Sequence, residues 1–122
     1  QAQEFQKRTG IKCEVVIDPK DIVVDTALRT ALSGGTPRSG IVASAVNGRI
    51  YVFGGESPER TFNAVEEFNP KTDFWRKMPP MPAARHGLGS TVIGHTIYVI
   101  DGGRTPGGSS PTGLHEVFNP QP

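Results

Sequence analysis

Short apolar runs, separated by stretches rich in glycine, proline and polar residues, dominate the chain from residue 36 onward. The run at residues 49–55 reads Arg-Ile-Tyr-Val-Phe-Gly-Gly, and it recurs at residues 96–103 as Thr-Ile-Tyr-Val-Ile-Asp-Gly-Gly. Consecutive apolar positions are typical of a strand buried on both faces, and the glycine doublet marks where that strand ends. The pattern therefore predicts two inner β-strands, at residues 50–53 and 97–100.

These two runs belong to a longer internal repeat. Tyr51 aligns with Tyr98 and Arg38 with Arg85 at an offset of 47 residues. The glycine doublets are offset by 48, and the two Phe-Asn-Pro units at 68–70 and 118–120 by 50. From the sequence we interpret Asp101 as an extra residue, and we expect the insertions to fall in loops after the apolar runs.

Each repeat predicts a series of antiparallel strands. Asn47-Gly48 is a hairpin signal between two apolar runs, and the Asn-Pro pairs open turns. We expect strands at residues 41–46, 50–53, 64–68, 74–78, 88–93, 97–100 and 114–118. Four antiparallel strands per repeat are typical of a propeller blade. The expected fold class is mainly β, with two such blades, the last of which lacks its outer strand.

Several residues within this pattern carry a resemblance to a known family. They are Gly54, Gly55, Phe68 and Trp75, the segment Met-Pro-Ala-Ala-Arg-His-Gly at residues 81–87, and the second set Gly102, Gly103 and Phe118. Together they resemble the kelch family of β-propellers over about residues 36–122. The resemblance implies one blade at residues 36–83 and an incomplete second blade at 84–122, because the tryptophan expected seven residues after Phe118 would be position 125.

The first 35 residues differ in composition from the rest. Of 26 glycines and prolines, only Gly10 and Pro19 precede Ser33. The pattern predicts a short α/β segment of helix, strand, strand and helix, ending at residues 33–35. The stretch EFQKRTGIKCEVVIDPKDIVVDTALRTAL resembles the opening of the ATP-binding domain of bacterial sensor histidine kinases of the nitrate-sensor type. The magnesium- and nucleotide-holding segments that this resemblance would require are missing, so we expect no ATP binding.

Composition and charge exclude several classes of protein. The 122 residues carry 13 Lys and Arg against 12 Asp and Glu, a formal net charge of +1, with no basic cluster. We therefore expect neither nucleic-acid binding nor membrane association. The single Cys13 forms no internal disulfide, and no signal-peptide pattern opens the chain. A cytoplasmic location is favoured, although an extracytoplasmic one after signal removal stays open.

The loops at residues 54–63 and 102–113 should emerge on the same rim of the blades as the segments that precede the first strands. That rim has the longer loops and is the expected binding face for a protein or a small ligand. Its candidate ligand-binding residues are Arg38, Glu56, Ser57, Arg60, Arg85, His86 and Arg104. For Arg38 and Arg85 we favour a structural role, with bonds to carbonyls of a neighbouring blade.

No candidate catalytic residues, metal ligands or cofactor sites emerge from the sequence. His86, His95 and His115 do not show zinc-ligand spacing. Glu66 and Glu67 are adjacent on an expected strand, which sends them to opposite faces and prevents them from acting as a catalytic pair.

The leading functional interpretation is a non-enzymatic binding module. The alternatives are a sugar-acting enzyme of kelch type, a recombined or engineered chain without evolved activity, and, least favoured, an ATP-binding kinase fragment. Because two blades leave apolar faces open, we expect a homo-oligomer that completes the propeller, with a trimer first and a dimer or tetramer next. A strand at residues 13–17 is the expected partner for the open edge of the last blade.

Overall fold

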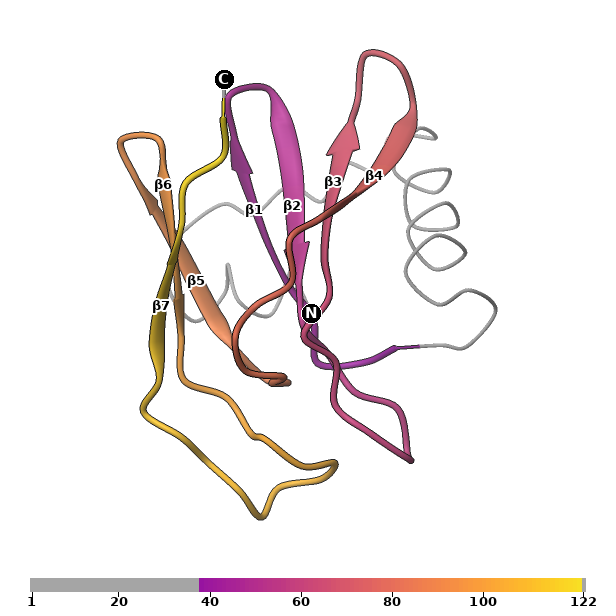
Figure 1. Cartoon of the computed structure of the whole chain (residues 1–122), viewed down its shortest axis with the longest axis vertical. Helices are drawn as coiled ribbons and strands as arrows, with labels where there is room; N and C mark the ends of the chain where they lie inside the picture. Colours follow the sequence, from indigo (N-terminus) through magenta and orange to yellow (C-terminus); the bar gives the residue numbers. More distant parts are fainter. Residues whose placement is uncertain (1–37, 122) are drawn as a thin grey trace, which may run out of the picture.

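The computed structural model describes residues 38–121, which form two antiparallel β-sheets without helices (Figure 1). The first sheet has the order β1-β2-β3-β4 and the second the order β5-β6-β7. The strands are β1 (Val42–Val46), β2 (Arg49–Phe53), β3 (Val65–Asn69), β4 (Phe74–Met78), β5 (Gly89–Ile93), β6 (Thr96–Ile100) and β7 (His115–Phe118). The mainly-β prediction, with a fourth strand missing from the second sheet, is confirmed for the described residues. The α/β segment expected before residue 36, including the strand at 13–17, lies outside them.

Local turn chemistry explains the strand pairing. Asn47 and Gly48 both have positive φ, 55° and 71°, which is the geometry of a two-residue hairpin between β1 and β2. At the next hairpin, the backbone N–H of Asp73 donates to the Asn69 carbonyl at 2.8 Å. The Asn69 side-chain oxygen accepts from the N–H of Lys71 at 3.0 Å. Both signals were visible in the sequence, and each of the seven strands expected between residues 41 and 118 is found within one residue of its expected bounds.

The register of the repeat differs from the sequence prediction at Asp101. Gly54 has φ 65° and donates its N–H to the carbonyl of Ala64, while Asp101 has φ 59° and donates to that of Leu114. Asp101 is therefore the structural equivalent of Gly54, and its interpretation as an extra residue is wrong. The insertion lies later in the loop. In the first repeat, the N–H of Ser57 donates to the carbonyl of Arg60 and closes a turn. The equivalent turn of the second repeat is closed by the N–H of Arg104 and the carbonyl of Ser110, and it is three residues longer.

The core lies between the two sheets. The ring centroid of Phe118 is 5.4 Å from that of Tyr51 and 5.6 Å from that of Phe53. Ile97 and Val99 of β6 are buried in the same cluster. Side chains alternate along a strand, so the Tyr51 side of the first sheet is the side that packs against the second sheet.

The outer faces of the two sheets differ in burial. On the far side of the first sheet, Val52 and Phe68 are 0% and 2% exposed, and the Phe68 ring lies 4.8 Å from that of Trp75. On the far side of the second sheet, Ile93 and Val117 are 65% and 53% exposed. None of the described residues covers that side, so the burial of β6 on both faces, expected in a completed propeller, stays a prediction. Residues 38–121 also contain no helix that could cross a membrane.

Candidate binding rim

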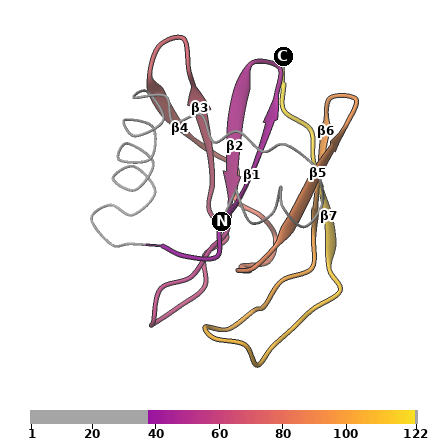
Figure 2. The same cartoon turned by 180° about the vertical axis from the view of Figure 1, so that it is seen from behind.

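The loop rim comprises the loops 54–63 and 102–113 together with the residues just before β1 and β5. It lies at the opposite end of the sheets from the hairpin turns, as both views show (Figures 1 and 2). Ser39 and Glu56 exchange two backbone hydrogen bonds of 2.9 and 2.8 Å, and His86 and Gly103 do the same at 3.0 and 2.8 Å. The segment before each first strand is thereby fixed to the loop after the second strand of the same sheet.

The glycine doublet makes this close approach sterically feasible. Gly54 has a positive φ, and a Cβ placed there would lie 2.3 Å from the carbonyl oxygen of Arg85. The same carbonyl accepts the N–H of Gly55 at 2.9 Å, which ties the first loop to the segment before β5. A side chain at Gly54 would therefore separate the two halves of the rim.

Each loop is also closed by a serine. The Ser57 hydroxyl accepts from the N–H groups of Glu59 and Arg60, both at 3.3 Å. The Ser110 hydroxyl accepts from the N–H groups of Arg104 and Thr105 at 3.1 and 2.8 Å. Serine side chains that bond nearby backbone in this way stabilise turns.

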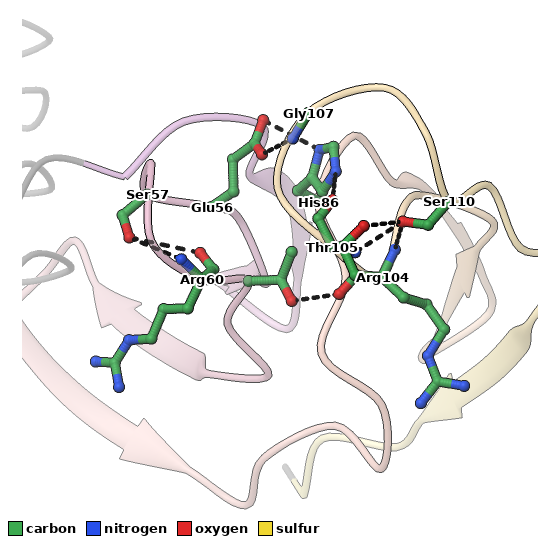
Figure 3. Close-up of polar contacts among 9 residues, drawn as sticks. Glu56, Ser57, Arg60, His86, Arg104, Thr105, Gly107 and Ser110 are labelled. Carbon is green, nitrogen blue, oxygen red and sulfur yellow. Dashed lines mark hydrogen bonds and ion pairs between the residues drawn. The ribbon is translucent and has the colours of Figure 1, made fainter.

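The two loops are bonded to each other as well (Figure 3). Glu56 accepts the N–H of Gly107 at 2.8 Å with one carboxylate oxygen, and its other oxygen lies 3.2 Å from Nδ1 of His86. Nε2 of His86 lies 2.9 Å from the Thr105 carbonyl oxygen. Both ring nitrogens face acceptors, so a neutral imidazole donates to one of them and a protonated one to both. A further bond runs from the Thr61 hydroxyl to the carbonyl of Arg104 at 2.6 Å.

Two arginines extend from this framework. Arg60 and Arg104 are exposed, and their guanidinium groups point outward from separate loops (Figure 3). The Arg60 guanidinium lies over the ring of Phe62, 4.7 Å from its centroid. Neither arginine forms an ion pair with another residue in the range 38–121.

Arg38 and Arg85 take part in the sheets instead. Arg38 pairs with Glu66 at 2.9 Å, and Arg85 pairs with Glu116 at the equivalent position of the second repeat. Arg85 also donates to the carbonyls of Asp101 at 2.9 Å and Leu114 at 3.3 Å. These carbonyls belong to its own sheet, so the expectation of bonds to a neighbouring blade is wrong for Arg85.

Burial changes the acidity of the carboxyl group in the Arg38–Glu66 pair. Burial raises the pKa of Glu66 above its usual value, and the bond from Arg38 offsets this only in part. Glu67, on the opposite side of β3, instead accepts the Tyr51 hydroxyl at 2.8 Å and pairs with Arg76 at 3.0 Å. The two adjacent glutamates therefore have separate partners, as the strand geometry predicted.

The structure thus brings together Glu56, Ser57, Arg60, His86 and Arg104, and separates Arg38 and Arg85 from them by burial. Sequence reasoning missed the contributions of Thr61, Thr105, Gly107 and Ser110. Their turn-forming residue types were visible, but contacts between loops more than 40 positions apart leave no local signal. Within the part of the chain that the structure describes, no three His, Cys, Asp or Glu side chains are grouped to hold a metal.

Comparison with known proteins identifies residues 37–82 as a Kelch motif. An F-box/kelch-repeat protein of Arabidopsis thaliana is 35% identical over 85 residues, which are 69% of this chain and 18% of the relative. An N-acetylneuraminate epimerase of Shigella sonnei is 36% identical over 80 residues, 60% of this chain and 20% of the epimerase. These comparisons do not support the kinase resemblance of the first 32 residues.

A solved structure described as that of YjhT superposes on the chain with a TM-score of 0.54. It is 31% identical, and the match covers 58% of this chain and 22% of the other. The chain therefore spans about a fifth of the length of the proteins it matches. The motif, the relatives and the two sheets together support a kelch β-propeller, of which this chain provides two sheets.

Proposed function

We propose that this chain is a non-enzymatic binding module, part of a kelch propeller, that recognises a partner protein through the loop rim. The observation that carries this proposal is the bonded pair of loops with Arg60 and Arg104 exposed on it. Loops ordered before binding lose less conformational entropy in a complex, so their contacts contribute more to affinity. The kelch resemblance supports the same class, since propellers of this family commonly bind ligands through such loops.

The chemistry of the rim indicates what the partner presents. The carboxylate of Glu56 is engaged by His86 and Gly107, whereas the guanidinium groups of Arg60 and Arg104 keep donors available. Guanidinium groups bind carboxylates through paired, charge-assisted hydrogen bonds. We therefore propose an acidic surface segment of a protein as the ligand of this rim.

An enzyme fragment is the second candidate, and the similarity to N-acetylneuraminate epimerase supports it. Against it stands the environment of the two buried carboxylates in residues 38–121. Glu66 is bonded to Arg38, and Glu67 to Tyr51 and Arg76, so neither is free to exchange a proton with a substrate. The binding module is therefore the function that the geometry favours.

A titration with a glutamate hexapeptide, followed by amide NMR, tests the proposal. We expect shifts in residues 56–62 and 104–111, and binding weakened at least about tenfold when Arg60 and Arg104 are both changed to Gln, the magnitude typical of lost charged hydrogen bonds. Lys71→Gln, which removes an exposed charge at the hairpin end, is the matched control and should bind normally. Equal weakening by Lys71→Gln would show that only net charge matters and would reject the rim. Turnover of N-acetylneuraminate by the chain would instead support the enzyme candidate.

A further inference from the structure

His86 of the second repeat occupies the position that Ser39 holds in the first repeat. Each of the two residues exchanges backbone hydrogen bonds with the loop after the second strand of its sheet, Ser39 with Glu56 and His86 with Gly103. A serine is therefore sufficient for the backbone role of this position. The contacts of the imidazole ring are what distinguish the second repeat from the first.

Gly103 provides the space for this ring. A Cβ placed at Gly103 would lie 2.6 Å from Nε2 of His86, so any side chain there would displace the imidazole. In the first repeat the arrangement is reversed, because the small Ser39 is bridged to Glu56, which carries a long side chain. The imidazole is thus seated over the glycine of its own repeat, within reach of the carboxylate of the other repeat.

The ring joins the two loops of the rim (Figure 3). Nδ1 of His86 lies 3.2 Å from one carboxylate oxygen of Glu56, and Nε2 lies 2.9 Å from the carbonyl oxygen of Thr105. The other carboxylate oxygen of Glu56 accepts the N–H of Gly107 at 2.8 Å. The side chains of His86 and Glu56 are only 13% and 22% exposed, so water competes weakly for these bonds.

Protonation decides how many of these bonds the ring can make. A neutral imidazole has one N–H donor and leaves its second nitrogen facing an oxygen, whereas an imidazolium donates from both nitrogens. Histidine side chains ordinarily take up this proton between about pH 5 and 8, where glutamate is still ionised. A fall in pH therefore turns one bond into two charge-assisted bonds, one to Glu56 and one to the Thr105 carbonyl.

The remaining charged side chains around the ring leave this contact to Glu56. Among residues 38–121, Glu56 is the ion-pair partner of His86. Two of the others are paired with buried glutamates, and the rest are exposed. They are Arg38 and Arg85, which are paired, and Glu59, Arg60, Asp101 and Arg104, which are exposed.

We propose that His86 is a pH switch that sets the order of the loop rim. The imidazolium fixes the loop 102–113 to Glu56 through the Thr105 carbonyl and the Gly107 N–H, and loss of its proton loosens that loop. Arg104 directly precedes Thr105, so His86 acts as a positioning residue for this guanidinium. The effect on affinity rests on the binding function proposed above, whereas the closing of the loops does not.

Amide exchange of the free protein tests the switch without a ligand. Gly107 should be protected about threefold to tenfold more in the wild type than in His86→Gln at about pH 5.5, and about equally at about pH 8. Glutamine keeps a donor but does not titrate, and the ratio of the two proteins removes the intrinsic pH dependence of exchange. His95→Gln, in the turn between β5 and β6, is the control and should behave like the wild type.

Titration with the glutamate hexapeptide at the same two pH values tests the consequence for binding. The affinity of the wild type should rise about threefold to tenfold more on acidification than that of His86→Gln. Glu56→Gln keeps an acceptor for Gly107 and leaves His86 able to protonate, but removes the carboxylate, so it should lose this extra rise. An equal rise in Glu56→Gln would show that the imidazolium charge alone attracts the peptide, and would overturn the switch.

The ratio of Gly107 protection separates this proposal from the binding function. The switch is overturned if the ratio between the wild type and His86→Gln is the same at both pH values. If the hexapeptide binds at neither pH, the acidic ligand proposed for the rim is rejected, and the exchange ratio alone decides whether His86 closes the loops.

Discussion

At the scale of single residues, each of the two repeats contains an arginine–glutamate ion pair. Arg38 with Glu66 and Arg85 with Glu116 occupy equivalent positions, and each pair joins the segment before the first strand to the third strand of its sheet. A buried charge is tolerated when it is paired and hydrogen-bonded, and is costly when its partner is removed. Arg38 and Arg85, for which the sequence favoured a structural role although both were also candidate ligand contacts, thus join these segments of each sheet.

We expect Arg85→Ala to lower the free energy of unfolding by about 3–5 kcal/mol, because it leaves Glu116 and two carbonyls without their donor. Arg85 is 0% exposed, so solvent cannot replace the lost bonds without rearrangement. Urea unfolding followed by circular dichroism measures the effect. Arg60→Ala, at an exposed site, is the control and should change stability by less than about 0.5 kcal/mol. A near-neutral Arg85→Ala would contradict the structural role.

Tyr51 predicts a dependence of stability on alkaline pH. Burial raises its pKa from 10.0 to about 12, and the bond to Glu67 and the charge of that carboxylate act in the same direction. Folding favours the neutral phenol, so the stabilisation is complete below pH 10 and is lost as the pH rises from 10 to about 12. The loss is on the order of 2 kcal/mol.

Urea unfolding of the wild type and of Tyr51→Phe at pH values on both sides of this window measures the difference. We expect the stability difference between the two proteins to shrink as the pH rises. Since the chain has only two tyrosines, phenolate absorbance of Tyr51→Phe reports Tyr98 alone. A pH-independent difference would show that Tyr51 ionises equally in the folded and unfolded chain.

At the scale of elements, the sequence predicted what local chemistry determines. The hairpin at Asn47-Gly48 and the turn at Asn69 follow from residue types, and the strands between them follow from their apolar runs. The register at Asp101 was missed because the two glycine doublets were aligned by residue type. The structure instead repeats the positive φ of Gly54 at Asp101. The bonded loop pair was missed because it depends on how two separate sheets pack.

The strand end at Asp101 yields a prediction of its own. Asp101 has φ 59°, in a region that glycine adopts at lower cost, and its equivalent in the first repeat is Gly54. We expect Asp101→Gly to raise the free energy of unfolding by up to about 1 kcal/mol. The relief of backbone strain in the folded chain exceeds the cost of the added entropy of the unfolded chain. Thermal unfolding measures this. Glu59→Gly, at an exposed loop position without a positive φ, is the control and should not stabilise.

At the scale of the whole molecule, one apolar face of the second sheet is open among the described residues. Ile93, Ile100 and Val117 are exposed together on the far side of the second sheet, whereas Val52 and Phe68 on the far side of the first sheet are buried. The second sheet thus leaves one apolar face open among residues 38–121, and the expectation of a second open face stays a prediction. A head-to-tail ring needs two complementary faces, but a symmetric dimer needs only one.

We expect the homo-oligomer that the sequence predicted, a trimer first and a dimer or tetramer next, to bury this open face. Apolar surface left in water costs about 25 cal/mol per Å², which favours its burial. Light scattering should give the mass of more than one chain for the wild type and of one chain for Val117→Lys. Phe74→Lys, which places the same charge on an exposed ring at the β3–β4 hairpin, is the control and should keep the wild-type mass. A mass of two chains would replace the head-to-tail ring by a symmetric dimer, and a monomeric wild type without exposed-hydrophobe dye binding would reject association through this face.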